Sequence, residues 1–117
     1  MSQSVRNKSN AEHYTWGKQC DAWYLLKSAA LTVIQERMSP GSEETTHKHE
    51  KSRQFFFVLA GEATMLLDNV ALRVPAGQGI EVAPQIAHKI KNVSTDQDLE
   101  FLVISQPPSH DDRIDLQ

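Results

Sequence analysis

The sequence predicts an all-β protein, either a sandwich or a barrel. Short stretches rich in β-branched and aromatic residues recur roughly every ten residues along the chain. Turn signals built from Gly, Pro, Asn and Asp separate these stretches, and no segment shows a convincing helical period. Short strands at regular spacing are typical of all-β sandwiches and barrels.

The pattern predicts about nine short strands. They cover residues 22–27, 31–38, 45–49, 54–59, 63–67, 70–74, 80–83, 88–93 and 99–105. Ser39-Pro40-Gly41 predicts a turn, and Asp68-Asn69 predicts a two-residue hairpin of the primed type. The run QFFFVL, residues 54–59, is almost continuously apolar, as in a strand that is buried on both faces.

The chain is long enough for a single domain. Its 117 residues suffice for one hydrophobic core but not for two. Residues 1–12 are polar and predict a flexible N-terminal arm, residues 13–106 predict the barrel, and residues 107–117 predict a tail. The tail begins with Pro107-Pro108, which cannot continue a central strand, and we expect its His110 to be solvated.

Composition excludes several classes of partner. The net charge of -3 and the lack of a basic stripe give no reason to expect nucleic acid. No stretch approaches the roughly 18 unbroken apolar residues of a membrane-spanning helix. The single cysteine, Cys20, excludes an internal disulfide and fits a reducing compartment. We therefore expect a cytoplasmic protein.

Histidines provide the first sign of a functional site. His47 and His49 are one residue apart in a predicted strand, so both side chains point to the same face. His88 lies in a later predicted strand, and three imidazoles that converge inside a barrel would form an open metal site. Spacing alone does not show this convergence, because exposed histidines that bind nothing would give the same pattern.

Residues 41–61 resemble the first sequence motif of the cupin family, G-x5-H-x-H-x(3,4)-E-x6-G. Gly41, His47, His49 and Gly61 occupy the matching positions, and Gln54 stands where the motif has glutamate. An amide offers a neutral and weaker oxygen ligand than a carboxylate. Gln54 could bind a metal through its oxygen, swing away, or hydrogen-bond a metal-bound water, and we favour weak or indirect contact.

Residues 77–92 resemble the second cupin motif, G-x5-P-x-G-x2-H-x3-N. Gly77, His88 and Asn92 match, whereas Ala83-Pro84-Gln85 stands in place of P-x-G. Loss of that glycine predicts either a turn without positive φ or a strained Gln85. The resemblance implies a double-stranded β-helix of the jelly-roll type, the cupin barrel. It also implies one divalent transition metal per chain (Fe, Mn, Ni or Zn) at His47, His49, Gln54 and His88.

Strand alternation predicts the surroundings of this site. If the histidines face inward, the inward-facing neighbours form a largely apolar pocket for a small ligand, although each could equally be ordinary core. These predicted pocket residues are Ile34, Met38, Phe56, Ile90 and Asn92. Glu36 shares the inward face and is a candidate catalytic base, or else it pairs with an arginine.

Phe55 and Phe57 should face outward on the strand that carries Gln54. Outward aromatic side chains on a barrel strand need a cover, which a second subunit would supply. The resemblance to small cupins supports a homodimer.

Two classes of function remain open from the sequence. The first is a metal-dependent enzyme that acts on a small molecule; dioxygenase chemistry is the leading hypothesis, and isomerisation or decarboxylation is an alternative. The second is a non-catalytic module that binds a small ligand or a metal. A barrel that has lost its metal and keeps its histidines as polar lining is a third reading.

Overall fold

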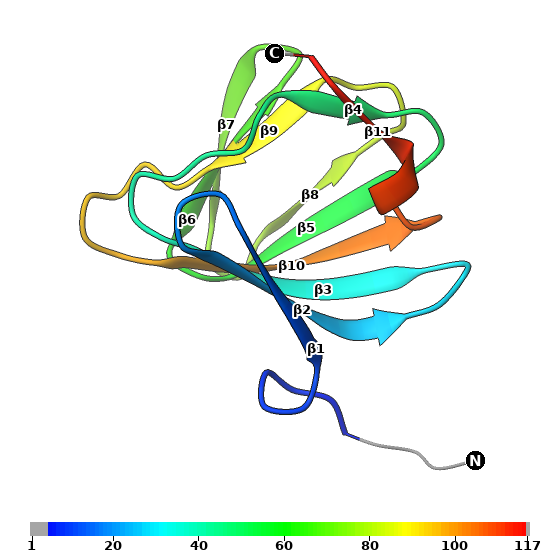
Figure 1. Ribbon diagram of the computed structural model, residues 1–117. Coiled ribbons are helices and arrows are strands. Elements are labelled where there is room, and N and C mark those ends of the chain that lie inside the picture. The colour runs from blue at the N-terminus through cyan, green and yellow to red at the C-terminus, as the bar shows by residue number, and fades with distance from the viewer. Residues whose placement is uncertain (1–4, 117) are drawn as a thin grey trace.

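Two antiparallel sheets face each other and enclose the core of the protein (Figure 1). The structure is a computed structural model that describes residues 5–116. The larger sheet has six strands in the order β1-β2-β3-β10-β5-β8, and the smaller has five in the order β11-β4-β9-β6-β7. This arrangement confirms the predicted all-β fold and the double-stranded β-helix.

Eleven strands and one short 3-10 helix make up the described chain. Their bounds are β1 Glu12–Trp16, β2 Cys20–Lys27, β3 Thr32–Met38, β4 His47–His49, β5 Arg53–Ala60, β6 Glu62–Leu67, β7 Val70–Pro75, β8 Gly79–Val82, β9 His88–Lys91, β10 Leu99–Gln106, η1 His110–Asp112 and β11 Arg113–Asp115. All nine predicted strands are present, with shifts of a few residues at their ends. The sequence patterns missed β1 and β11, which are polar and largely exposed. Among the described residues, no helix is long and apolar enough to cross a membrane.

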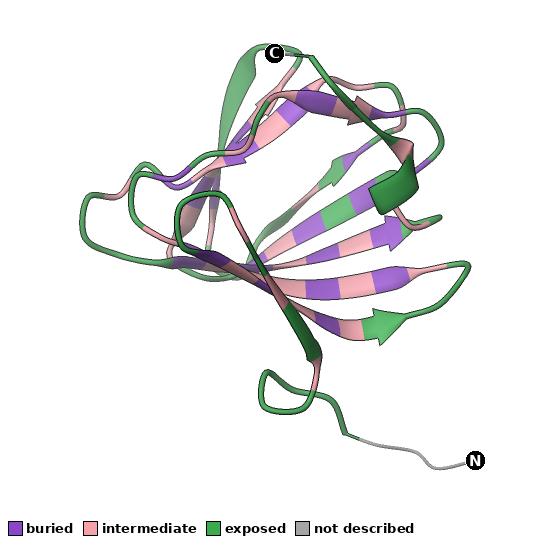
Figure 2. Cartoon of the chain, viewed as in Figure 1, coloured by how far each residue is buried: buried purple, intermediate pink, exposed green. Residues whose placement is uncertain are grey.

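Alternation along the strands builds the core between the sheets. Buried and partly exposed residues alternate along β2, β3, β5 and β10, which appears as colour bands in Figure 2. On β5, Phe56 and Val58 are buried, whereas Phe55 is 40% exposed, so the predicted inward and outward faces of this strand are confirmed. The largest fully buried apolar side chains are Phe101, Met38, Met65, Ile90 and Leu99.

The C-terminal segment returns to the barrel and adds a strand to it. β11 pairs with β4, and the backbone N–H of Leu116 donates to the Thr46 carbonyl at 2.9 Å. Asp112 fastens this segment to the loop after β4, because its carboxylate accepts the backbone N–H groups of Glu50, Lys51 and Ser52 at 2.7 to 3.1 Å. Desolvation alone would raise the pKa of the Asp112 carboxyl. These hydrogen bonds act in the opposite direction, and the pKa is lower than usual as a result.

Two turns have the backbone conformations that their sequences predict. Asp68 and Asn69 adopt φ of 46° and 68°, which is the primed turn expected between β6 and β7. Gln85 adopts φ of 73°, so the second of the two predicted outcomes at this position holds. Its backbone N–H donates to the His49 carbonyl at 2.7 Å and its amide donates to the Glu50 carbonyl at 3.1 Å. These bonds offset the strain of a left-handed conformation.

A β-branched residue at position 85 should destabilise the protein. We expect Gln85→Val to lower the free energy of unfolding by about 1–3 kcal/mol, because the left-handed conformation is least accessible to such side chains. Gln85→Asn should stay within about 0.5 kcal/mol of the wild type, because asparagine tolerates this conformation well. Urea denaturation of the three proteins checks the prediction, and a Val variant as stable as the Asn variant would contradict it.

Candidate metal centre and cavity

The three motif histidines converge on the inner face of the smaller sheet. β4 and β9 are adjacent and antiparallel, and His47 pairs directly with His88. His49 shares the face of His47 because two residues separate successive side chains on one side of a strand. All three are at most 5% exposed, and their potential ligand atoms lie within 4.8 Å of one another. The convergence that spacing could not show is therefore present.

Backbone carbonyls orient two of these rings. Nδ1 of His47 lies 2.8 Å from the Thr45 carbonyl, and Nδ1 of His88 lies 2.9 Å from the Ile86 carbonyl. A carbonyl can only accept, so Nδ1 carries the hydrogen in both rings and Nε2 keeps its lone pair. Nε2 of His88 is buried without a hydrogen-bond partner, and so are both ring nitrogens of His49. Three converging rings, two of which carry buried nitrogens without a partner, fit a transition-metal ion.

Burial keeps these imidazoles in the neutral form that a metal requires. It lowers the pKa of His47 and of His88, although their hydrogen bonds to backbone carbonyls act in the opposite direction. For His49, burial and then the neighbouring His47 and His88 lower the pKa to about 4. A proton therefore competes weakly for this cluster near neutral pH.

Gln54 lines the same cavity as His47 and His49 and has an amide oxygen without a partner. Its Nε2 donates to the Ser105 hydroxyl at 3.0 Å, whereas its Oε1 is buried and has no hydrogen-bond partner. Its oxygen is therefore available either to a metal or to a water bound by that metal.

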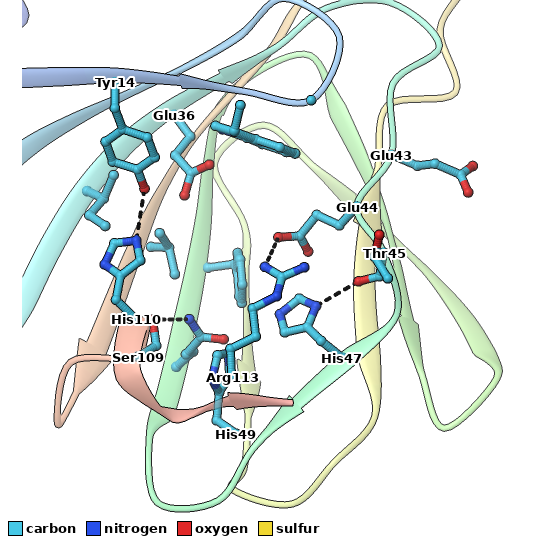
Figure 3. A pocket seen from close by; sticks show the side chains of 16 residues that line it. Tyr14, Glu36, Glu43, Glu44, Thr45, His47, His49, Ser109, His110 and Arg113 are labelled. Atoms are coloured by element: carbon cyan, nitrogen blue, oxygen red, sulfur yellow. Dashed lines mark hydrogen bonds and ion pairs between the residues drawn. The ribbon is translucent and has the colours of Figure 1, made fainter. Parts of the chain in front are cut away.

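A cavity of about 400 Å³ adjoins the cluster (Figure 3). Its lining comes from strands of both sheets and from the C-terminal segment: Tyr14, Trp16, Gly17, Ile34, Glu36, Glu43, Glu44, Thr45, His47, His49, Gln54, Phe56, Val103, Ser109, His110 and Arg113. Of the predicted pocket residues, Ile34 and Phe56 line it.

Met38, Ile90 and Asn92 lie outside this lining, in the core. Met38 and Ile90 are at most 1% exposed. The Asn92 amide donates to the carbonyls of Met38, Ser39 and Gln97 at 2.8 to 3.3 Å. It therefore links the end of β3 to the loop before β10. Inward orientation on a strand therefore did not suffice to place a side chain on the cavity.

Glu36 faces the cavity from β3, as Figure 3 shows. Burial, and then the charge of Glu44, raise the pKa of its carboxyl to about 8, and the effect of the Trp16 indole N–H in the opposite direction is smaller. That indole nitrogen has no partner that meets ordinary hydrogen-bond geometry, so its contact with Glu36 is loose. Glu36 is therefore mostly protonated at neutral pH and can give or take a proton.

Several cavity residues come from segments to which the sequence patterns assigned no strand, namely the region before residue 22, the loop before the first histidines and the C-terminal tail. His110 of η1 is hydrogen-bonded through Nδ1 to the Tyr24 hydroxyl at 2.5 Å, and its Nε2 lies 3.4 Å from the Tyr14 hydroxyl. It remains exposed, as expected, but it is held between two rings. Glu44 and Arg113 were also missed: Glu44 lies between a predicted turn and a predicted strand, and the only signal for Arg113 was the cluster of polar residues after the last predicted strand.

The fold and this site together define a double-stranded β-helix with a histidine cluster in its interior. The chain belongs to the cupin family, since the cupin domain matches residues 34–105. The uncharacterized protein MJ1618 of Methanocaldococcus jannaschii is 38% identical over 89 residues, which span 75% of this chain and 70% of that protein.

Solved structures with the same fold are more distant in sequence. KdgF from Halomonas sp. superimposes with a TM-score of 0.82 at 15% identity, covering 94% of this chain and 98% of that one. The polyketide cyclase RemF from Streptomyces resistomycificus superimposes with a TM-score of 0.84 at 16% identity, covering 100% of this chain and 87% of that one. A predicted oxalate decarboxylase from Thermotoga maritima superimposes with a TM-score of 0.80 at 22% identity, covering 91% of this chain and 100% of that one. At these identities the likeness concerns the fold alone.

A carboxylate in place of the Gln54 amide should tighten metal binding. We expect Gln54→Glu to lower the Kd for Zn²⁺ by about ten-fold or more, because it adds a negative charge next to the histidines. Gln106→Glu, which adds the same charge at an exposed end of β10, is the matched control and should leave the Kd unchanged. Competition with a chromogenic chelator measures both. Equal affinities in the two variants would place Gln54 away from the metal.

In the metal-free protein, His49 should contribute a loss of stability as the pH falls below about 6.5. The unfolded chain binds protons at its histidines near pH 6.5, whereas folded His49 does so only near pH 4, so the unfolded state takes up more protons in this window. His49→Gln should therefore show a shallower decline between these two pH values. Glu36 acts in the opposite direction in both proteins, so it cancels in the comparison. Urea midpoints at intervals across the window measure the two slopes, and parallel slopes would contradict the assignment.

Proposed function

We propose that this cupin is a metal-dependent enzyme that transfers protons on a small, oxygen-bearing molecule. The observation that carries the proposal is the convergence of His47, His49 and His88 next to a cavity, with unpartnered ring nitrogens on His49 and His88. His47, His49 and His88 would hold one divalent transition metal, with Gln54 beside it. When bound, such a metal supplies a Lewis acid that polarises an oxygen of the substrate.

The chain's own residues supply acid and base groups. Glu36 carries a proton near neutral pH and lies on the cavity wall, which suits a residue that must both give and take a proton. Tyr14 and His110 line the same cavity, and Tyr24 and Tyr14 hold the imidazole of His110. Ile34, Phe56 and Val103 contribute an apolar wall that limits access of water to the reacting groups.

Dioxygenase chemistry, the leading hypothesis from the sequence, becomes the second candidate. A three-histidine site with open positions supports it, but it gives no role to the protonated Glu36. Isomerisation or decarboxylation gives that carboxyl a task, and a predicted decarboxylase and a cyclase share the fold. A non-catalytic binding module remains the alternative in a different class, with the same cavity used for capture without turnover.

Assembly as a homodimer in the cytoplasm is a further part of the proposal. Phe55 is 40% exposed on the outer face of the larger sheet, next to the partly exposed Phe57. Packing this face against a second copy would remove these aromatic rings from water.

Metal content is the first test of the proposed function. Protein purified without a chelator should contain about one equivalent of a transition metal, or take it up on titration, and His47→Ala should reduce that uptake strongly because it removes a ligand. Lys48→Ala, which alters the side chain between the two histidines, is the matched control and should keep the metal. Elemental analysis measures all three. A wild type that neither contains nor takes up metal would contradict the proposal.

Proton transfer is the second test. The metal-loaded protein should exchange the acidic C–H protons of at least one compound in a panel of keto acids and diketones dissolved in heavy water, as followed by NMR. Glu36→Gln should slow this exchange by about 100-fold or more with the metal content unchanged. Glu43→Gln is the matched control, because Glu43 also borders the cavity but pairs with Lys89 at 2.8 Å.

The same panel, extended by thiols and catechols, separates the alternatives. Consumption of dissolved oxygen together with loss of a panel compound would favour the dioxygenase over proton transfer. Binding of a compound without exchange, oxygen uptake or product would favour the binding module.

A further inference from the structure

Arg113 brings a positive charge to the histidine cluster. It opposes His49 in the antiparallel pairing of β11 with β4, and opposed residues project to the same face of a sheet. His49 faces the interior, so the Arg113 side chain reaches the cavity, where Figure 3 shows it beside His47 and Glu44. This places a guanidinium next to two of the three histidines.

The terminal nitrogens of Arg113 make a long ion pair with Glu44 but no hydrogen bond to it. Its Nε donates to Asp115 Oδ1 at 2.7 Å, which fixes the plane of the guanidinium. Its Nη1 lies 4.0 Å from Glu44 Oε2, beyond hydrogen-bonding distance. Glu44 uses its other oxygen to accept the Ile90 backbone N–H at 3.1 Å. Glu44 is therefore a long ion-pair partner of Arg113 without a hydrogen bond, and the guanidinium lines the cavity beside it.

The carboxyl groups around the cavity differ in their partners and in how readily they ionise. Glu43 points away from the cavity in Figure 3 and pairs with Lys89 at 2.8 Å. Burial raises the pKa of Glu36 to about 8 and also raises the pKa of Glu44. Asp115 lies at the exposed rim, where it is paired with Arg113. A bound divalent metal would add positive charge to the same cavity, and together with the guanidinium of Arg113 it would attract an anionic ligand.

We propose that the cavity binds small molecules that carry a carboxylate, and that Arg113 holds this group through its terminal N–H donors. A planar guanidinium matches the two oxygens of a carboxylate better than any other side chain does. The volume of about 400 Å³ and the apolar wall suit a small, partly apolar acid. The proposal rests on the proposed function, because it names the substrate class of the same site.

Paired acids and amides provide the test. Acetate, 2-oxobutyrate and salicylate, each with its neutral amide, would be titrated into zinc-loaded and metal-free protein by calorimetry. At least one acid should bind the wild type about ten-fold or more tighter than its amide. Arg113→Gln should weaken the acid by about ten-fold or more and leave the amide unchanged, because only the acid makes charge-assisted hydrogen bonds. Arg113→Lys, which keeps the charge without the fork, should give an intermediate affinity.

A loosened β11 would imitate the loss of Arg113, so a structural control is needed. Asp115→Ala removes the partner of Nε but keeps the guanidinium, and it should retain acid binding. Acids that bind no tighter than their amides, or equally well to the wild type and Arg113→Gln, would overturn the carboxylate proposal and leave the metal centre intact. A wild type that takes up no metal would instead contradict the proposed function. The titration of metal-free protein would then still decide whether Arg113 binds a carboxylate.

Discussion

The candidate site depends on the antiparallel pairing of β4 with β9. This short contact sets His47 opposite His88 and so unites two motifs that are far apart in the sequence. Shifting the register of either strand by one residue would turn its histidines to the other face. Hydrogen bonds around the pair hold this register: the Gln85 N–H donates to the His49 carbonyl, and Asp112 binds the loop that follows β4. The metal centre is thus fixed by backbone geometry more than by side-chain packing.

The cavity combines two environments with different tasks. On the smaller sheet, buried neutral imidazoles offer nitrogen lone pairs that no protein donor satisfies. On the larger sheet, Glu36 is desolvated enough to keep its proton near neutral pH. Leaving polar groups without partners in an interior is costly, so natural proteins tend to confine such groups to functional sites. A bound metal and substrate would provide partners for these groups. Binding would therefore remove the free-energy cost that the unpartnered groups impose on the free protein.

The C-terminal segment converts an open barrel end into a lined cavity. Ser109, His110 and Arg113 all come from it, and Tyr14 joins them from β1 at the other end of the chain. Neither segment is strongly apolar, and both are held by hydrogen bonds to other parts of the fold. β1 pairs with β2, Asp112 binds the β4–β5 loop and β11 pairs with β4. The residues that would select a substrate are therefore carried by the least hydrophobic parts of the fold. Substrate preference could change there without disturbing the core.

The sequence by itself determined the barrel, the three histidines and the inward face of β5. Strand alternation and motif spacing are local properties, which is why Phe56, Val58 and Glu36 were oriented correctly. Only the tertiary structure decided which inward residues reach the cavity: Met38 and Ile90 are sealed in the core. It also decided that Arg113 lies opposite His49. β11 is a polar strand of three residues, which is too short to show an alternating hydrophobic pattern, so the sequence did not predict its pairing with β4.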